Sequence, residues 1–165
     1  TLYPALPGKR DVLRAVLLEK FRGVEMDLEQ AMSGASTDVL GALHKLLACM
    51  RHHTDEIQPS FVRDIRREAP EFFKLIEHPR RRLIQRYFGR LFEAGQSAGI
   101  IRKDIATRLM IEMLVGVTEA IMNPPKMAEP GLTPRAGYTS LITVMLEGLL
   151  TEKGRTNNAA GLDRL

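Results

Sequence analysis

The sequence predicts an all-α fold, and three observations lead to that prediction. Apolar residues recur at the three- and four-residue spacing of a helix along almost every long segment, and no segment shows the sustained alternation of a strand. Clusters of proline, glycine and small polar residues separate these periodic segments. The 165 residues, 44% of them hydrophobic and 27% charged, are enough for one globular domain with a buried core.

The first two predicted helices are long and amphipathic. Gly8 can cap the first helix, whose apolar stripe spans 13–31 and ends at a break of small residues. Ser36 or Thr37 is the expected N-cap of the second helix, which carries its apolar face over 39–50. A Gln-Pro pair then ends the second helix.

The middle of the chain predicts two short amphipathic pieces followed by a long helix. The short pieces cover 61–65 and 72–76, and each follows a proline. Pro79 is well placed as the first residue of the long helix. Gly99 is expected to end that helix as a glycine C-cap, with Ile100 making the hydrophobic contact that accompanies such caps.

Two further helices complete the predicted bundle. Asp104 is expected to cap the first of them, and a proline-rich loop over 123–134 follows it. The last helix carries apolar residues over 138–150. We expect a helical domain over 9–153 and a flexible polar tail over 154–165.

Composition narrows the classes of function. A formal net charge of +4 permits contact with nucleic acid, but aromatic residues, at 5%, are too few for a typical single-strand binder that stacks bases. No apolar run approaches the roughly 18–20 residues of a membrane span, so we expect no membrane partner. Cys49 is the only cysteine, which argues against a disulfide framework and favours a cytoplasmic location.

Catalytic and metal-binding motifs are lacking in the sequence. There is no HExxH, GxSxG or phosphate-binding glycine pattern, so we expect no enzyme and no cofactor. His52 and Glu56 have the spacing of two ligands on one helix face, but a zinc site needs three protein ligands, so we expect no metal. We interpret Cys49 as a small buried hydrophobe and the arginine stripe over 80–90 as a solvated face.

The two closing helices carry more apolar surface than one small core requires. Residues 109–122 are apolar nearly all round, with Glu112 and Glu119 confined to one narrow stripe. A central helix in a monomeric bundle would explain this pattern, but a homodimer through a four-helix interface explains it more simply. The small side chains among them would let a second backbone approach closely, and the predicted interface comprises Leu114, Gly116, Val117, Ala120, Ile121, Leu141, Met145 and Leu149.

The first residues carry a specific resemblance. The opening Thr-Leu-Tyr, followed by Pro7, Lys9, Asp11 and Leu13, resembles the junction that closes the helix-turn-helix domain of the tetracycline-repressor (TetR) family. Residues 91–104, which contain Gly-Gln-Ser-Ala-Gly before a short charged turn, are similar to a common segment of that family's regulatory part. Two residues depart from the family's usual pattern: Leu6 stands where Phe is usual, and Pro4 stands at a position that is usually helical.

The resemblance implies a fold and a set of DNA contacts. It implies a helical bundle of the TetR C-terminal type, in which 9–153 binds ligand and dimerises through the last two long helices. Residues 1–8 would be the remnant of an N-terminal DNA-binding domain whose base-reading helices are absent from this sequence. Thr1, Tyr3 and Lys9 would contact DNA phosphates, which position a protein without reading the bases.

The resemblance also implies a small-molecule effector among the middle helices. Methionine and phenylalanine stripes are usually core, but flexible apolar walls also suit a pocket for molecules of varied shape. The expected pocket residues are Met50, Phe61, Ile65, Phe88, Phe92, Met110 and Met113.

Together these features predict a DNA-binding transcription regulator that acts as a repressor. Two identical subunits would hold their reading heads at successive major grooves of a double-stranded operator. A small, largely apolar effector would favour the DNA-incompetent state and so lower operator affinity. The alternative is a helical protein-interaction or adaptor domain with no small-molecule ligand.

Overall fold

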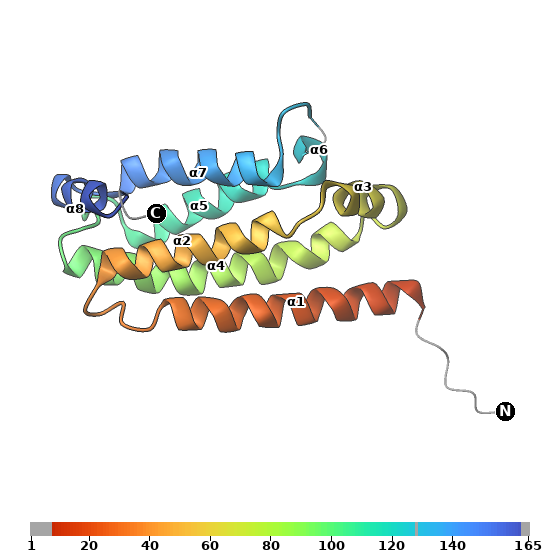
Figure 1. Cartoon of the computed structure of the whole chain (residues 1–165), viewed down its shortest axis with the longest axis horizontal. Helices are drawn as coiled ribbons and strands as arrows, with labels where there is room; N and C mark the ends of the chain where they lie inside the picture. Colours follow the sequence, from red (N-terminus) through yellow and green to blue (C-terminus); the bar gives the residue numbers. More distant parts are fainter. Residues whose placement is uncertain (1–7, 128, 163–165) are drawn as a thin grey trace.

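The computed structural model describes residues 8–127 and 129–162, where the expected all-α fold is confirmed (Figure 1). Within these ranges the β-structure is limited to an isolated bridge between Ile101 and Leu150. No described helix has the length and apolar character needed to cross a membrane. The helices are α1 Lys9–Ala31, α2 Val39–Asp55, α3 Pro59–Glu68, α4 Phe72–Ser97, α5 Thr107–Ile121, α6 Pro124–Met127, α7 Pro134–Leu149 and α8 Glu152–Leu162.

The long helices run alternately in opposite directions along the length of the molecule (Figure 1). Helix α1 lies along one edge, α5 and α7 lie at the opposite edge, and α2 and α4 lie between them. The short helices α3 and α6 lie at the end where α1 begins, and α8 lies at the other end. This order leaves α1, α5 and α7 each with one side away from the bundle.

Helix α4 supplies the centre of the core. Its stripe of large apolar residues, which periodicity predicted, packs against α1, α2 and α5. Leu91 and Phe92 are almost completely buried, and they share one cluster with Leu46 of α2 and Met110 of α5. The buried stripe of α4 is Leu83, Ile84, Tyr87, Phe88, Leu91 and Phe92.

The prediction that a long helix starts at Pro79 is wrong, because α4 begins at Phe72 and continues through the proline. A proline inside a helix removes one backbone hydrogen bond and crowds the preceding turn. Phe72 lies in phase with the main stripe, and its burial against Ile65 and Ala69 favours the continuous helix. Burial of the Phe72 ring thus offsets the cost of placing Pro79 inside the helix.

Two expected caps are replaced by neighbouring groups. The N-cap of α2 is Asp38, whose Oδ1 accepts a hydrogen bond from the Gly41 amide at 2.9 Å. Thr37 instead donates its hydroxyl to the Gly34 carbonyl in the preceding turn. Asp104 does not cap α5, because its carboxylate accepts two hydrogen bonds from the Arg102 guanidinium, at 2.6 and 2.7 Å.

The glycine cap at the end of α4 is confirmed. Gly99 has φ of +73°, and the Ile100 amide donates to the Gly95 carbonyl at 2.9 Å. Ile100 and Ile101 are both buried behind this turn. The chain therefore reverses sharply and returns along the bundle as α5.

The segment expected to form a polar tail contains helix α8. The Thr151 amide donates to the Ile100 carbonyl at 2.9 Å, and the Thr151 hydroxyl accepts from the Gly154 amide at the start of the helix. His44 of α2 pairs with Asn158 at 2.7 Å. These contacts hold α8 against the end of the bundle, an arrangement that apolar periodicity could not indicate.

Most of the arginine stripe of α4 lies at the surface, where it pairs with glutamates of the flanking helices, whereas Arg80 is half-buried and donates to the Met122 carbonyl. On the α1 side Arg86 contacts Glu25 at 3.1 Å and Arg90 contacts Glu29 at 3.3 Å. The Tyr87 hydroxyl donates to Glu29 at 2.8 Å. Burial raises the pKa of Tyr87 to about 12, while its hydrogen bond lowers the pKa of Glu29.

Gly95→Ala is expected to lower the free energy of unfolding by about 1–3 kcal/mol through overpacking. A methyl group on Gly95 would lie 2.5 Å from Cδ1 and 2.7 Å from Cγ1 of the buried Ile101. Gly89→Ala in the same helix is the control, because no atom lies within 4 Å of its new methyl group. The free energy of unfolding of the control, measured in urea, should rise by about 0.5–1 kcal/mol. Equal effects of the two changes would contradict this packing.

Glu29→Gln is expected to lower the melting temperature at neutral pH but not in acid. The pKa of Glu29 is lowered in the folded state, so the carboxylate stabilises the fold above its unfolded pKa and loses this effect as pH falls through the folded pKa. The difference from the wild type should therefore shrink as pH falls below the unfolded pKa and vanish once pH is below the folded-state pKa of Glu29. Glu19→Gln, which removes an exposed pair within α1, should change little at either pH. A deficit independent of pH would contradict the assignment.

Candidate functional site

The residues predicted to line an effector pocket lie in three environments. Four belong to the main core or pack against it: Met50, Phe88, Phe92 and Met110. Ile65 lies in a second, smaller core beneath α3, whereas Phe61 and Met113 are exposed. None of the seven lines either of the two hollows described next.

The first hollow is a half-enclosed groove of about 240 Å³ between α1 and the beginning of α4, called here the α1–α4 groove. It lies along the half of α1 nearer the N-terminus. Its walls are mainly apolar, and a proline of α4 closes one side. The lining residues are Arg14, Leu17, Leu18, Phe21, Lys74, Leu75, His78 and Pro79.

The titratable groups that line the α1–α4 groove are all basic. Arg14 comes from α1, and Lys74 and His78 come from α4, while no carboxylate lines the groove. Neither Arg14 nor Lys74 forms an ion pair with the described part of the chain. An apolar molecule that carries one anionic group therefore matches both the walls and the charge of the groove.

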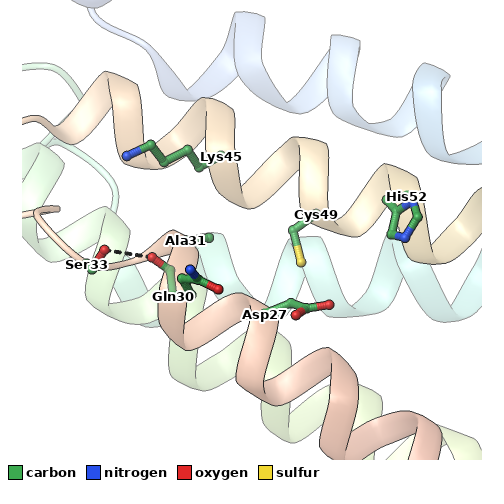
Figure 2. Close-up of a pocket in the computed structure, with 7 residues that line it drawn as sticks. All are labelled: Asp27, Gln30, Ala31, Ser33, Lys45, Cys49 and His52. Carbon is green, nitrogen blue, oxygen red and sulfur yellow. Dashed lines mark hydrogen bonds between the residues drawn. The ribbon is translucent and has the colours of Figure 1, made fainter.

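The second hollow, the α1–α2 hollow, is larger and more polar (Figure 2). It has a volume of about 440 Å³ and opens widely to solvent. The Ser33 hydroxyl donates to the Gln30 carbonyl at its edge. The lining residues are Asp27, Gln30, Ala31, Ser33, Lys45, Cys49 and His52.

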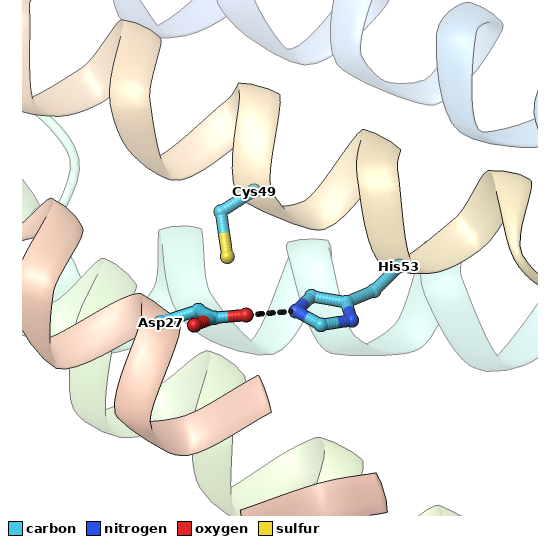
Figure 3. A group of neighbouring side chains, drawn as sticks. All are labelled: Asp27, Cys49 and His53. Carbon is cyan, nitrogen blue, oxygen red and sulfur yellow. Dashed lines mark hydrogen bonds and ion pairs between the residues drawn. The ribbon is translucent and has the colours of Figure 1, made fainter. Parts of the chain in front are cut away.

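Three chemically distinct side chains meet beside this hollow (Figure 3). Asp27 Oδ2 lies 2.9 Å from His53 Nε2, and Cys49 Sγ lies within 4.8 Å of the Asp27 carboxylate and of the His53 ring nitrogen. Burial raises the pKa of the Cys49 thiol to about 11, and burial also lowers the pKa of His53. The thiol and the imidazole are therefore both neutral at pH 7.

The predicted dimer residues divide between the core and the surface. Leu114, Leu141 and Leu149 are buried in the chain's own core, and Ile121 and Met145 are half-buried. The remaining three, Gly116, Val117 and Ala120, lie on the exposed side of α5.

An exposed row of small and apolar residues, called here the α5 stripe, runs along that side of the helix. Leu109 is 51% exposed, Met113 is 47% exposed and Val117 is 37% exposed. On the neighbouring α7, Val144 is 71% exposed. The α5 stripe consists of Leu109, Met113, Gly116, Val117 and Ala120.

The predicted phosphate contacts are only partly within the described residues. Thr1 and Tyr3 lie outside them. Lys9 lies at the first turn of α1, where its ammonium donates to Glu68 of α3 at 2.9 Å. The hydrogen bond to Glu68 raises the pKa of Lys9, which remains charged and largely exposed.

Comparison with known proteins adds no relative: no family model, curated protein or solved structure matches the chain.

Medium-chain carboxylates such as decanoate are expected to bind the α1–α4 groove. Leu75→Glu, which places an acid in the groove, should weaken decanoate binding at least about tenfold, as measured by calorimetry. Arg14→Gln should weaken decanoate but leave decanol almost unchanged. Val16→Glu is the matched control, because Val16 is exposed on α1 but does not line the groove. Equal loss in the control, or no binding by the wild type, would contradict this assignment.

Proposed function

We propose that the chain is the regulatory and dimerisation part of a DNA-binding transcription repressor of the TetR type. Its affinity for double-stranded operator DNA would be controlled by a small, largely apolar effector. The resemblances at the start of the chain and over 91–104 support this proposal. The all-helical bundle, with a long first helix leading in from the N-terminal segment, is compatible with it.

The α5 stripe is the observation that carries the proposal. Leu109 and Met113 are about half exposed although both are large and apolar. Burying them against another surface would be favourable by roughly 25 cal/mol per Å² of apolar area removed from water. A repressor of this kind requires two subunits, and the stripe offers a surface on which they could meet.

The order of residues in the α5 stripe favours a second copy of the chain as its occupant. In an antiparallel, two-fold pairing of α5 with its copy, Leu109 falls opposite Ala120 and Met113 falls opposite Gly116. Leu109 and Met113 would therefore each face a small residue, which lets the two backbones approach closely there. Val144 on α7 would extend the contact into a four-helix interface.

The α1–α4 groove could couple effector binding to the DNA-binding segment through α1. An apolar anion in the groove would contact Leu17 and Phe21 on the half of α1 nearest the N-terminal residues. If it binds one position of α1 relative to α4 more tightly than another, it shifts the population of α1 positions. In a dimer this shift changes the separation of the two DNA-binding segments.

The direct test uses the protein expressed from its complete gene. Binding sites would be selected from random double-stranded DNA, and operator affinity would then be measured with and without decanoate. The proposal predicts a dimer on a palindromic site and at least about a tenfold loss of affinity with effector. Absence of any DNA binding, or binding that decanoate and other apolar anions leave unchanged, would reject the mechanism.

Val117→Glu is expected to separate the subunits, because in this pairing position 117 falls opposite Glu112 of the copy, so the new carboxylate would face a like charge. The dimer dissociation constant in sedimentation should rise roughly a hundredfold or more. Met26→Glu is the control, because Met26 is also apolar and, at 73%, more exposed than Val117, but it lies on α1, at the opposite edge of the bundle. A wild-type chain that is monomeric at micromolar concentration would favour the adaptor function instead.

A further inference from the structure

We propose that Asp27, Cys49 and His53 form a binding site for a zinc-type transition-metal ion between α1 and α2 (Figure 3). The site would supply three protein ligands of three kinds, one carboxylate oxygen, one thiolate sulfur and one imidazole nitrogen. This inference is independent of the DNA-binding function proposed above.

The backbone places the three ligands correctly. Cys49 and His53 stand four residues apart on α2, so both side chains leave the same face of that helix, the spacing of the paired ligands in helical zinc sites. Asp27 reaches toward them from α1. The three ligand atoms lie within 4.8 Å of one another, whereas tetrahedral zinc holds its ligand atoms roughly 3.5 Å apart. Binding would therefore require the Cys49 sulfur to move closer and the Asp27–His53 hydrogen bond, now 2.9 Å long, to open around the ion.

The surroundings of His53 match those of a metal ligand. Nδ1 of His53 is buried and has no hydrogen-bond partner in the described part of the chain. Glu56 Oε2 lies 3.5 Å from this nitrogen, and Lys20 of α1 holds the same carboxylate in an ion pair. Histidines that bind metal through one nitrogen commonly donate the other N–H to a carboxylate. Glu56 is placed for that role once Nε2 binds a metal.

The chemistry of the set selects the class of metal. A thiolate and an imidazole suit zinc and related transition ions, whereas magnesium and calcium prefer oxygen ligands alone. As the metal–sulfur bond forms, the Cys49 thiol proton passes to solvent. Cys49 and Asp27 also line the α1–α2 hollow, so a fourth coordination position faces solvent and can hold water or an external ligand (Figure 2).

The test titrates the purified, chelator-treated chain with Co²⁺, whose thiolate complexes absorb strongly in the near ultraviolet, and then displaces Co²⁺ with Zn²⁺. One Co²⁺ per chain, with a thiolate band, is expected for the wild type. Cys49→Ser should abolish the band, and Asp27→Asn and His53→Gln should each weaken binding at least about tenfold. Glu56→Gln should also weaken binding, roughly tenfold, without removing the band.

His52→Gln is the matched control. It removes the neighbouring histidine of α2, which is 68% exposed at its side chain and faces Glu56, whereas His53 is 14% exposed. Its metal affinity should stay within about twofold of the wild type, and circular dichroism should show equal helicity in all variants. Zinc should also protect Cys49 of the unmodified wild type from alkylation. A wild type that binds no Co²⁺ at micromolar concentration, or loss of binding in His52→Gln but not in His53→Gln, would overturn the proposal.

Discussion

Helix α5 has apolar side chains on more of its circumference than the described chain covers, and this constraint underlies the proposed function. One side, with Met110 and Leu114, packs into the core built by α4. The other side presents the α5 stripe to solvent. In a monomer this apolar surface would stay exposed to water. A two-fold pairing would bury it and fix the relative orientation of the two bundles.

Helix α1 is held by different contacts along its two halves. Its second half is fixed to α4 by ion pairs of Glu25 and Glu29 with the arginine stripe. Its first half borders the α1–α4 groove, where apolar contacts leave room for a ligand. The proposed metal site joins the second half to α2 through Asp27. The first half also pairs with Glu68 and Glu71 through Lys9 and Arg10, so a ligand in the groove would act on the first half of α1, and a metal would reinforce the second.

Periodicity predicted the main features of the fold and part of the candidate surfaces. It located the buried stripe of α4 and the Gly99 turn, because both depend on local sequence. It could not place the start of α4, which depends on the burial of Phe72 in a separate small core. For a helix that is apolar all round, periodicity does not say which side is inner, so Leu114, predicted to lie at the interface, is buried in the core, whereas Leu109 is exposed. Asp27 could not be grouped with Cys49 and His53, because that meeting requires two helices to pack.

A cross-linking measurement tests the pairing of α5 most directly. In a Cys49→Ser chain, a cysteine introduced by Ala120→Cys would lie opposite Leu109 of the copy, so Leu109→Cys in the same chain completes a pair across the two-fold axis. Mild oxidation should convert this double variant to a covalent dimer, while cysteines introduced by Val12→Cys and Met26→Cys on α1 should leave the chains unlinked. Failure of the α5 cysteines to link, or equally efficient linking through α1, would contradict the account.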